Sequence, residues 1–123
     1  MSRGVLIDSN VLIDLTTPDS PFHDWSSQQI RHCLRNGTAR INPIIYAELA
    51  AAFATPSDLD AFLPPDAFER RPLPFAAGFA AGQAFVTYRR RGGTKTAPLP
   101  DFYIGAHALT EDFTLLTRDE ARF

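Results

Sequence analysis

The sequence contains a single cysteine, a single tryptophan and no long hydrophobic run. One cysteine, Cys33, excludes an internal disulfide and any zinc cluster built on several thiolates, and its helical context predicts a small buried side chain. No stretch of about 18 consecutive apolar residues is present, so no transmembrane helix is expected. The first residues contain too short an apolar run for a signal peptide, and we therefore expect a cytoplasmic protein.

The chain also lacks an excess of charge of either sign. Its 12 Lys and Arg residues stand against 14 Asp and Glu residues, which gives a formal net charge of -2. This balance excludes a strongly basic coat for nucleic acid but permits a local basic patch. With 45% hydrophobic and 21% charged residues, the composition is that of an ordinary globular protein. The length predicts a single domain over residues 1–123.

Short apolar runs alternate with longer helical segments along the chain. Asn10 is a suitable cap for a helix that follows the first strand, and Gly37 is a suitable stop for the next helix. The alternation predicts an α/β fold around a central, mostly parallel sheet. Strands are expected at residues 5–7, 38–42, 68–73 and 113–116. Helices are expected from residue 11 to the loop at 18–21, and at 25–36, 43–53, 55–62, 75–91 and 100–109.

Two of these helices carry apolar residues at helical spacing, which predicts the faces that they bury. The segment 75–91 is also rich in Ala and Gly, so another helix could approach it closely, in the core or across a two-fold dimer contact. In the helix 25–36 the expected buried residues are Trp25, Ile30, Cys33 and Leu34. In the helix 75–91 they are Phe75, Phe79, Gly82 and Val86.

Four acidic residues follow or interrupt apolar runs. Asp8 ends the first strand and Asp119 follows the last one, whereas Glu48 and Asp101 lie on helices. The carboxyl ends of parallel strands meet at one edge of a sheet, so we expect these carboxylates to share a pocket. Clustered carboxylates repel one another unless cations neutralise them, and oxygen ligands favour Mg²⁺ or Mn²⁺. Two divalent ions would balance four carboxylates and could accept an anionic phosphodiester.

Most of these acids have an equally simple structural interpretation. Asp8 and Asp119 could each cap a helix or turn, and Asp101 follows Pro100 at a helix start, where an acid suits the helix dipole. Glu48 has no such explanation, because its neighbours are apolar. Asp14, close to Asp8 in the sequence, is expected to face solvent or to lie behind the site, and Glu120 is expected to behave in the same way.

The basic and aromatic residues allow two interpretations. Arg89, Arg90 and Arg91, with Lys95, form the basic cluster of the chain, which could guide RNA phosphates or could be a solvated helix end. Tyr88 and Tyr103 could stack on bases, although packing between helices is the expected role. The histidines are poor metal ligands, because no pair of them has the required spacing; they are His23, His32 and His107.

Four segments together resemble a PIN-domain ribonuclease, and within that group a VapC-type toxin of a type II toxin–antitoxin system. LIDSNVLIDL resembles the family's opening strand with its acid and following Asn, and IIYAELAAAF resembles the helix with the family's Glu. YRRRGGTKTAPLPDFYIGAHAL resembles the stretch that leads to the third acid, and FTLLTRDEARF resembles the closing strand with a Thr and the fourth acid. Matched residue by residue, the acids are Asp8, Glu48, Asp101 and Asp119, and the accessory polar residues are Asn10 and Thr117.

The resemblance implies a PIN-like three-layer α/β/α fold and Mg²⁺- or Mn²⁺-dependent cleavage of structured RNA such as transfer RNA. It further implies a cognate VapB-type antitoxin and a homodimer. Family members commonly continue into another strand after the closing motif, whereas this sequence stops at Phe123, so we expect that C-terminal strand to be missing.

Three other functions fit parts of the pattern. A catalytically inactive PIN-like module that binds RNA or protein would share the fold, although the presence of all four acids favours the enzyme. A signalling receiver needs a second acid beside the first strand and a late lysine, but Asp8 has no acidic neighbour and Lys95 is the only lysine. A phosphatase built on Asp8 would need another Asp two residues later, where Asn10 stands.

Overall fold

The structure, a computed structural model, describes residues 3–92 and 99–118. At its centre is a four-stranded sheet in the order β3-β2-β1-β4, and every described pair of neighbouring strands is parallel. The predicted α/β fold is therefore confirmed. The strands are β1 (Val5–Ile7), β2 (Ala39–Ile41), β3 (Glu69–Arg70) and β4 (Thr114–Leu116).

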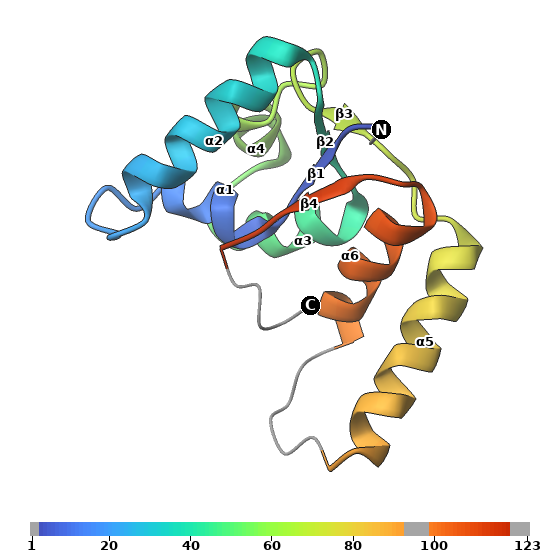
Figure 1. Cartoon of the computed structure of the whole chain (residues 1–123). Coiled ribbons are helices and arrows are strands. Elements are labelled where there is room, and N and C mark those ends of the chain that lie inside the picture. The colour runs from blue at the N-terminus through green and yellow to red at the C-terminus, as the bar shows by residue number, and fades with distance from the viewer. Residues whose placement is uncertain (1–2, 93–98, 119–123) are drawn as a thin grey trace.

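Helices cover both faces of the sheet. Helix α2 packs on β2, α6 packs on β4, and α5 lies antiparallel beside α6 on the other side of the strands from α2 (Figure 1). Among the described residues, no helix combines the length and the apolar character that crossing a membrane requires. The helices are α1 (Ser9–Leu15), α2 (His23–Asn36), α3 (Pro43–Ala50), α4 (Pro56–Phe62), α5 (Phe75–Arg90) and α6 (Leu99–Thr110).

Local signals set most helix boundaries as expected. Helix α2 ends at Gly37, whose positive φ of 65° suits a residue without a side chain. Helix α3 begins after Asn42, whose side-chain oxygen accepts a hydrogen bond of 2.9 Å from the Ile45 amide. Helix α4 begins after Thr55, which caps the Asp58 amide at 3.1 Å.

The first helix begins earlier than the sequence predicts. Asp8 occupies the N-cap position, with extended backbone angles of φ -62° and ψ 147°, and α1 starts at Ser9. Asn10, predicted to be the cap, lies inside the helix and is buried. The strand therefore passes into the helix with a single residue between them, which leaves the Asp8 side chain at the end of β1.

Helix α5 buries a face other than the predicted one. Ala77 and Ala81 are fully buried against Ala106 of α6, whereas Phe75 is 99% exposed and Phe79 is 73% exposed. The small alanine side chains let the two helices approach closely, and the phenylalanines cannot fit into that contact. The predicted apolar face of α5 thus points away from the core of this chain.

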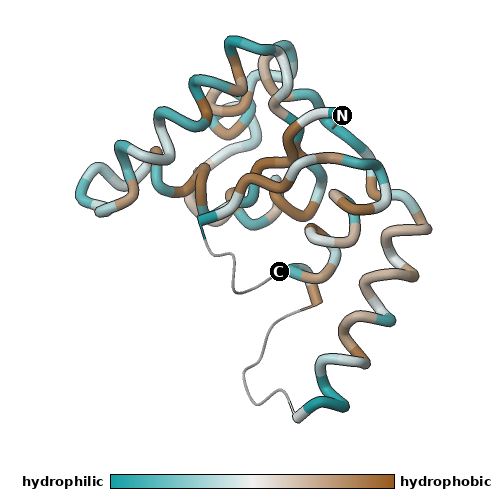
Figure 2. The backbone as a smooth tube through the Cα atoms, in the orientation of Figure 1, coloured by the Kyte–Doolittle hydropathy of each residue, from teal (hydrophilic) through white to brown (hydrophobic). Residues whose placement is uncertain are grey.

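The predicted face of α2 is only half correct. Ile30 and Cys33 are buried in the main core, but Trp25 is 40% exposed and Leu34 is 38% exposed. The main core instead gathers the apolar residues of the strands and of α1, α3 and α4 around the sheet. Figure 2 shows this distribution, with hydrophobic residues at the strands and hydrophilic residues along much of α2 and at the end of α5.

A candidate active site at the carboxyl edge of the sheet

The ends of β1 and β4 bring two polar residues together. Ile7 pairs with Leu116 in the parallel register, so Asp8 and Thr117 follow at the same edge of the sheet. The Asp8 amide donates to the Leu116 carbonyl at 2.9 Å, and the Thr117 hydroxyl donates to Asp8 Oδ2 at 2.9 Å. Asp8 is fully buried. Strand pairing therefore places these two residues side by side although 109 positions separate them.

Asn10 completes a short chain of hydrogen bonds. Its side-chain amide Nδ2 donates to Thr117 Oγ1 at 3.3 Å, and Thr117 in turn donates to Asp8. With Nδ2 directed to Thr117, the Asn10 Oδ1 atom is buried and has no hydrogen-bond partner among the residues that the structure describes. Buried acceptors normally have a partner, so this oxygen is suited to bind a cation or a water molecule.

Glu48 joins this edge through a residue that the sequence analysis missed. The Ser9 hydroxyl, next to Asp8 in the chain, donates to Glu48 Oε1 at 2.9 Å and so connects α1 to α3. Glu48 lies on the exposed side of α3 with Ala47 and Ala50, whereas Ile45 and Leu49 on the other side of the helix are buried. The apolar run around Glu48 thus combines buried residues with exposed alanines.

Asp101 lies in the first turn of α6 and is 4% exposed. An acid there is favoured by the helix dipole, and α6 also packs against α3, which carries Glu48. Within residues 3–92 and 99–118, no three His, Cys, Asp or Glu side chains are arranged to hold a metal ion. The pocket shared by all four acids stays a prediction, and Asp119 lies outside the described residues.

The oxygen atoms at this edge nevertheless suit a hard divalent cation as ligands. Asp8 contributes a buried carboxylate, Asn10 a buried amide oxygen, and Glu48 an exposed carboxylate whose Oε1 accepts from Ser9. All of these ligand atoms are oxygen, which Mg²⁺ and Mn²⁺ prefer over the nitrogen and sulfur ligands typical of zinc. The Asn10 oxygen is the observation that favours a bound cation most directly, because the described protein leaves it unsatisfied.

Asp14 is buried, which excludes the first of its two expected placements, facing solvent, and agrees with the second, behind the site. Its carboxylate accepts hydrogen bonds from Ser26 Oγ at 2.6 Å, Ser20 Oγ at 3.2 Å and Arg118 Nε at 2.9 Å, and the residue is 2% exposed. These bonds tie α1 to the start of α2 and to the segment that follows β4. Asp14 thus holds together the elements that carry Asp8 and Thr117.

A second buried polar group connects α3 to α6. Asn42 Nδ2 lies 2.9 Å from His107 Nδ1, and His107 Nε2 lies 2.5 Å from Glu111 Oε2. Because the Asn42 oxygen already caps Ile45, its Nδ2 must donate, so His107 Nδ1 accepts and the ring proton is on Nε2. This pair of contacts fixes the helix carrying Glu48 relative to the helix carrying Asp101.

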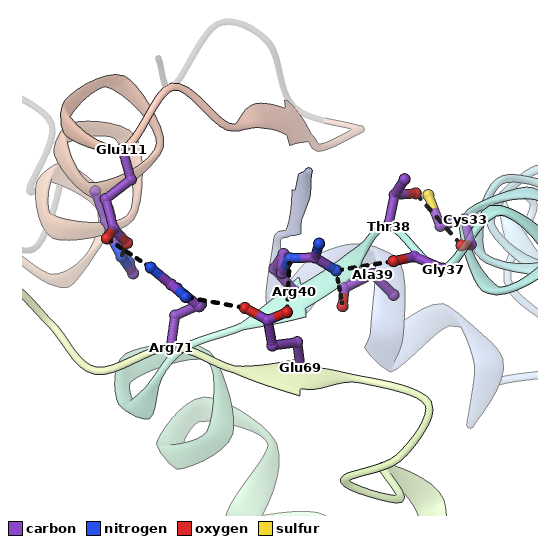
Figure 3. A network of polar contacts seen from close by, with 9 residues as sticks. Cys33, Gly37, Thr38, Ala39, Arg40, Glu69, Arg71 and Glu111 are labelled. Carbon is purple, nitrogen blue, oxygen red and sulfur yellow. Dashed lines mark hydrogen bonds and ion pairs between the residues drawn. The ribbon is translucent and has the colours of Figure 1, made fainter. Parts of the chain in front are cut away.

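The network continues across β3 and β2 through charged side chains. Figure 3 shows Arg71 between Glu111 and Glu69, at 3.0 Å and 3.1 Å, and Glu69 beside Arg40 at 3.4 Å. Burial opposes the ionisation of Glu111, but the hydrogen bonds from Arg71 and His107 outweigh it and hold the pKa of this carboxyl below its ordinary value. Glu111 therefore acts as an anion between two donors.

The predicted basic cluster is only partly described. Arg89, Arg90 and Arg91 are exposed at the end of α5, which extends past the first turn of α6 in Figure 1, whereas Lys95 lies outside the described residues. The Tyr88 ring centroid is 5.7 Å from that of Phe102 on α6. The expected packing of Tyr88 between helices is thus confirmed, and the arginines form an exposed cationic end of α5.

Comparisons with known proteins agree with this fold. The family model described as "PIN domain" matches residues 5–123. Three solved structures have similar folds at TM-scores of 0.70 to 0.71 and 18% to 20% sequence identity, and each covers 97% of this chain. They are VapBC2 from Rickettsia felis bound to a DNA fragment from its promoter, FitAcB from Neisseria gonorrhoeae, and VapBC-1 from nontypeable Haemophilus influenzae. The match spans 92%, 90% and 89% of those chains, respectively. A search of curated proteins found no match.

Proposed function

The chain belongs to the PIN domain family, and from this membership we propose that it is a metal-dependent endoribonuclease that acts as the toxin of a VapC-type toxin–antitoxin pair. PIN domains are typically nucleases, which supports the hydrolysis of a phosphodiester. Structured RNA, with transfer RNA as the first candidate, is the proposed substrate. The observation that carries the proposal is the buried Asp8, held by Thr117 beside the unsatisfied oxygen of Asn10.

The proposed ligands for Mg²⁺ or Mn²⁺ are oxygen atoms of residues that follow β1 and β4 in the sequence or lie on α1, α3 and α6. When bound, such an ion lowers the pKa of water and offsets the negative charge of the phosphodiester. Thr117 keeps the Asp8 carboxylate in one orientation, and Asn10, in the first turn of α1, supplies a buried oxygen without a partner among the described residues. The ligand set comprises Asp8, Asn10, Glu48, Asp101 and Asp119.

The histidines do not offer an alternative route through the RNA 2′-hydroxyl. That route needs an acid and a base placed together. His107 is buried between Asn42 and Glu111, and His23 Nδ1 contacts the Asp14 carbonyl at 2.9 Å. We therefore expect in-line attack by water, with products that carry a 5′-phosphate and a 3′-hydroxyl. The arginines at the end of α5, with Lys95, would bind the flanking phosphates.

The proposed protein partners are a VapB-type antitoxin and a second copy of the chain. Two of the similar structures are VapBC complexes, which supports an antitoxin. A groove of about 490 Å³ between α5, α6 and β4 could receive an apolar segment of that partner. Phe75 and Phe79 are exposed on α5 and support a two-fold contact. The groove is lined by Ala80, Ala84, Phe102, Gly105, Ala106, Ala108, Leu109, Phe113 and Leu115.

The test is cleavage of a transfer RNA pool by the wild type and by Asp8→Asn, with Asp66→Asn, at an exposed position, as the matched control. Asp8→Asn keeps the side-chain shape but removes one ligand charge, so cleavage should fall by about 100-fold or more. Urea unfolding should show that both variants remain folded, and Asp66→Asn should cleave like the wild type.

Chelation should abolish the wild-type cleavage, and added Mg²⁺ or Mn²⁺ should restore it. Cleavage that persists in chelator, or products with 2′,3′-cyclic phosphate ends, would contradict the metal mechanism. A chain that binds RNA but never cleaves it would instead be the inactive, RNA-binding member of the family.

A further inference from the structure

A pocket beside the candidate active site combines two exposed aromatic rings with a fixed guanidinium group. Its volume is about 440 Å³, within the range of about 300–1,000 Å³ that is common for small-molecule sites. It is lined by Phe22, Trp25, Thr117 and Arg118. Phe22 is 42% exposed and Trp25 is 40% exposed, so both rings offer apolar surface to an incoming planar group.

The guanidinium group of Arg118 is held in place by the core. Its Nε donates to Asp14 Oδ2 at 2.9 Å, and Asp14 is 2% exposed and also bonded to two serines. The Arg118 Cζ atom lies 4.8 Å from the centroid of the Phe22 ring, which is a cation–π contact. The cation in the wall of the pocket is therefore fixed by a buried acid, and the Phe22 ring packs against it.

The charge of the pocket favours a neutral aromatic occupant over a phosphate. Asp14 forms an ion pair with Arg118 and offsets its positive charge, so little net charge remains to attract an anion. Aromatic rings and guanidinium planes are the surfaces on which unpaired bases stack. The lining thus matches a nucleobase better than the RNA backbone.

The position of the pocket ties it to the acidic residues. Thr117 lines the pocket, and its hydroxyl donates to Asp8 at 2.9 Å. A base in the pocket would therefore lie next to a phosphate that is bound beside Asp8, at the carboxyl edge of the sheet. We propose that Phe22, Trp25 and Arg118 bind an unpaired nucleobase of the RNA, from the nucleotide that flanks the scissile phosphate. This inference rests on the proposed ribonuclease function and adds a base-binding subsite to it.

The single tryptophan allows a direct test, because Trp25 supplies all of the indole fluorescence. The full chain is titrated in chelator, which separates binding from cleavage, with a single-stranded RNA octamer and with the same octamer made of abasic nucleotides. The base-containing RNA should quench the fluorescence and the abasic RNA should not. Equal quenching by the two oligonucleotides would overturn the proposal, because the pocket would then respond to the backbone.

Affinity is measured in parallel with a dye-labelled octamer and four variants. Phe22→Leu and Trp25→Leu keep apolar volume but remove the rings, so the affinity for RNA should fall about 5- to 150-fold in each. Trp25→Phe keeps a ring and should retain most of the affinity. Leu34→Ala, at a 38% exposed position of the same helix, should bind like the wild type. Unchanged affinity in Trp25→Leu would refute the proposal.

The outcomes also separate this inference from the proposed function. If the wild type cleaves RNA and the leucine variants bind and cleave equally well, the ribonuclease stands and the base-binding subsite is wrong. If the base-dependent quenching is observed but no cleavage occurs with added metal, the subsite stands and the ribonuclease fails. If the leucine variants escape antitoxin inhibition while their RNA affinity is unchanged, the pocket belongs to a protein partner and the proposal is overturned.

Discussion

The buried contact between His107 and Asn42 provides a quantitative test of how α3 and α6 are held together. His107 is fully buried and Asn42 is 2% exposed, so a partner lost by either side chain cannot be replaced easily by solvent. His107→Leu keeps most of the volume but removes the acceptor for Asn42 Nδ2 and the donor to Glu111. Asn42→Ser isolates the contact between Asn42 and His107. Ser caps a helix about as well as Asn, but its side chain is too short to reach His107.

The magnitudes follow from the exposure of each partner. An unpaired buried donor on Asn42 costs about 1–3 kcal/mol. The loss of the His107 donor costs Glu111 about 1 kcal/mol or less, because Glu111 keeps its 3.0 Å contact with Arg71. His107→Leu should therefore lower the free energy of unfolding by about 1–4 kcal/mol, which a domain of ordinary stability survives. In the Asn42→Ser background the unpaired donor is absent, so the double variant should be about 1–3 kcal/mol more stable than the sum of the two single effects predicts.

Urea unfolding of the wild type, both single variants and the double variant gives this coupling energy, provided that the m-value is the same in all four. Additivity within about 0.5 kcal/mol would refute the assigned hydrogen bond and the tautomer with the proton on Nε2. Circular dichroism of the native proteins is the control for an unchanged helix content.

Three other predictions each concern one side chain. Burial raises the pKa of the Cys33 thiol against the hydrogen bond with Thr38, so a thiol reagent should modify the native chain far more slowly than the urea-unfolded chain; equal rates would contradict the burial. The pKa of Glu111 is lower in the folded state than in the unfolded state, so the unfolded chain takes up this proton first as the pH falls below about 4.3, and stability should decline there. Glu111→Gln should flatten that part of the stability profile, and an unchanged slope would show that other acids cause it. Phe75→Asp should lower the mass measured by light scattering to that of a monomer if α5 forms the two-fold contact, and a wild type that is monomeric at high concentration would reject that contact.

The sequence predicted the sheet and most helices because local signals specify them. Val5–Ile7 is an uninterrupted apolar run, as strands buried on both faces require, and Gly37 and Asn42 carry the stop and cap signals that the structure uses. The order of the elements then brought Asp8 and Thr117 to neighbouring strand ends. Their contact could be predicted from topology alone, although their role in cleavage stays a proposal.

What the sequence could not specify depends on shape and on partners that are distant in the chain. Phe75 and Ala77 both count as apolar, so periodicity cannot say which of them faces α6; the closeness of the two helices decides it. Asp14 and Arg118 are 104 positions apart, and the burial of that acid follows only once β4 pairs with β1. Ser9, whose hydroxyl holds Glu48, could have been found as the residue next to Asp8, had a link between α1 and α3 been considered.

The order of the strands in the sheet also determines when the candidate site can exist during synthesis. The last strand, β4, pairs with the first, β1, and Thr117 reaches Asp8 across 109 residues. At translation rates of about 5–20 residues per second, roughly 5 to 20 s therefore pass between the synthesis of Asp8 and that of Thr117. Closing so long a loop leaves this contact among the last to form. The hydrogen bond between Thr117 and Asp8 is therefore absent from every nascent chain in which residue 117 has not yet been made.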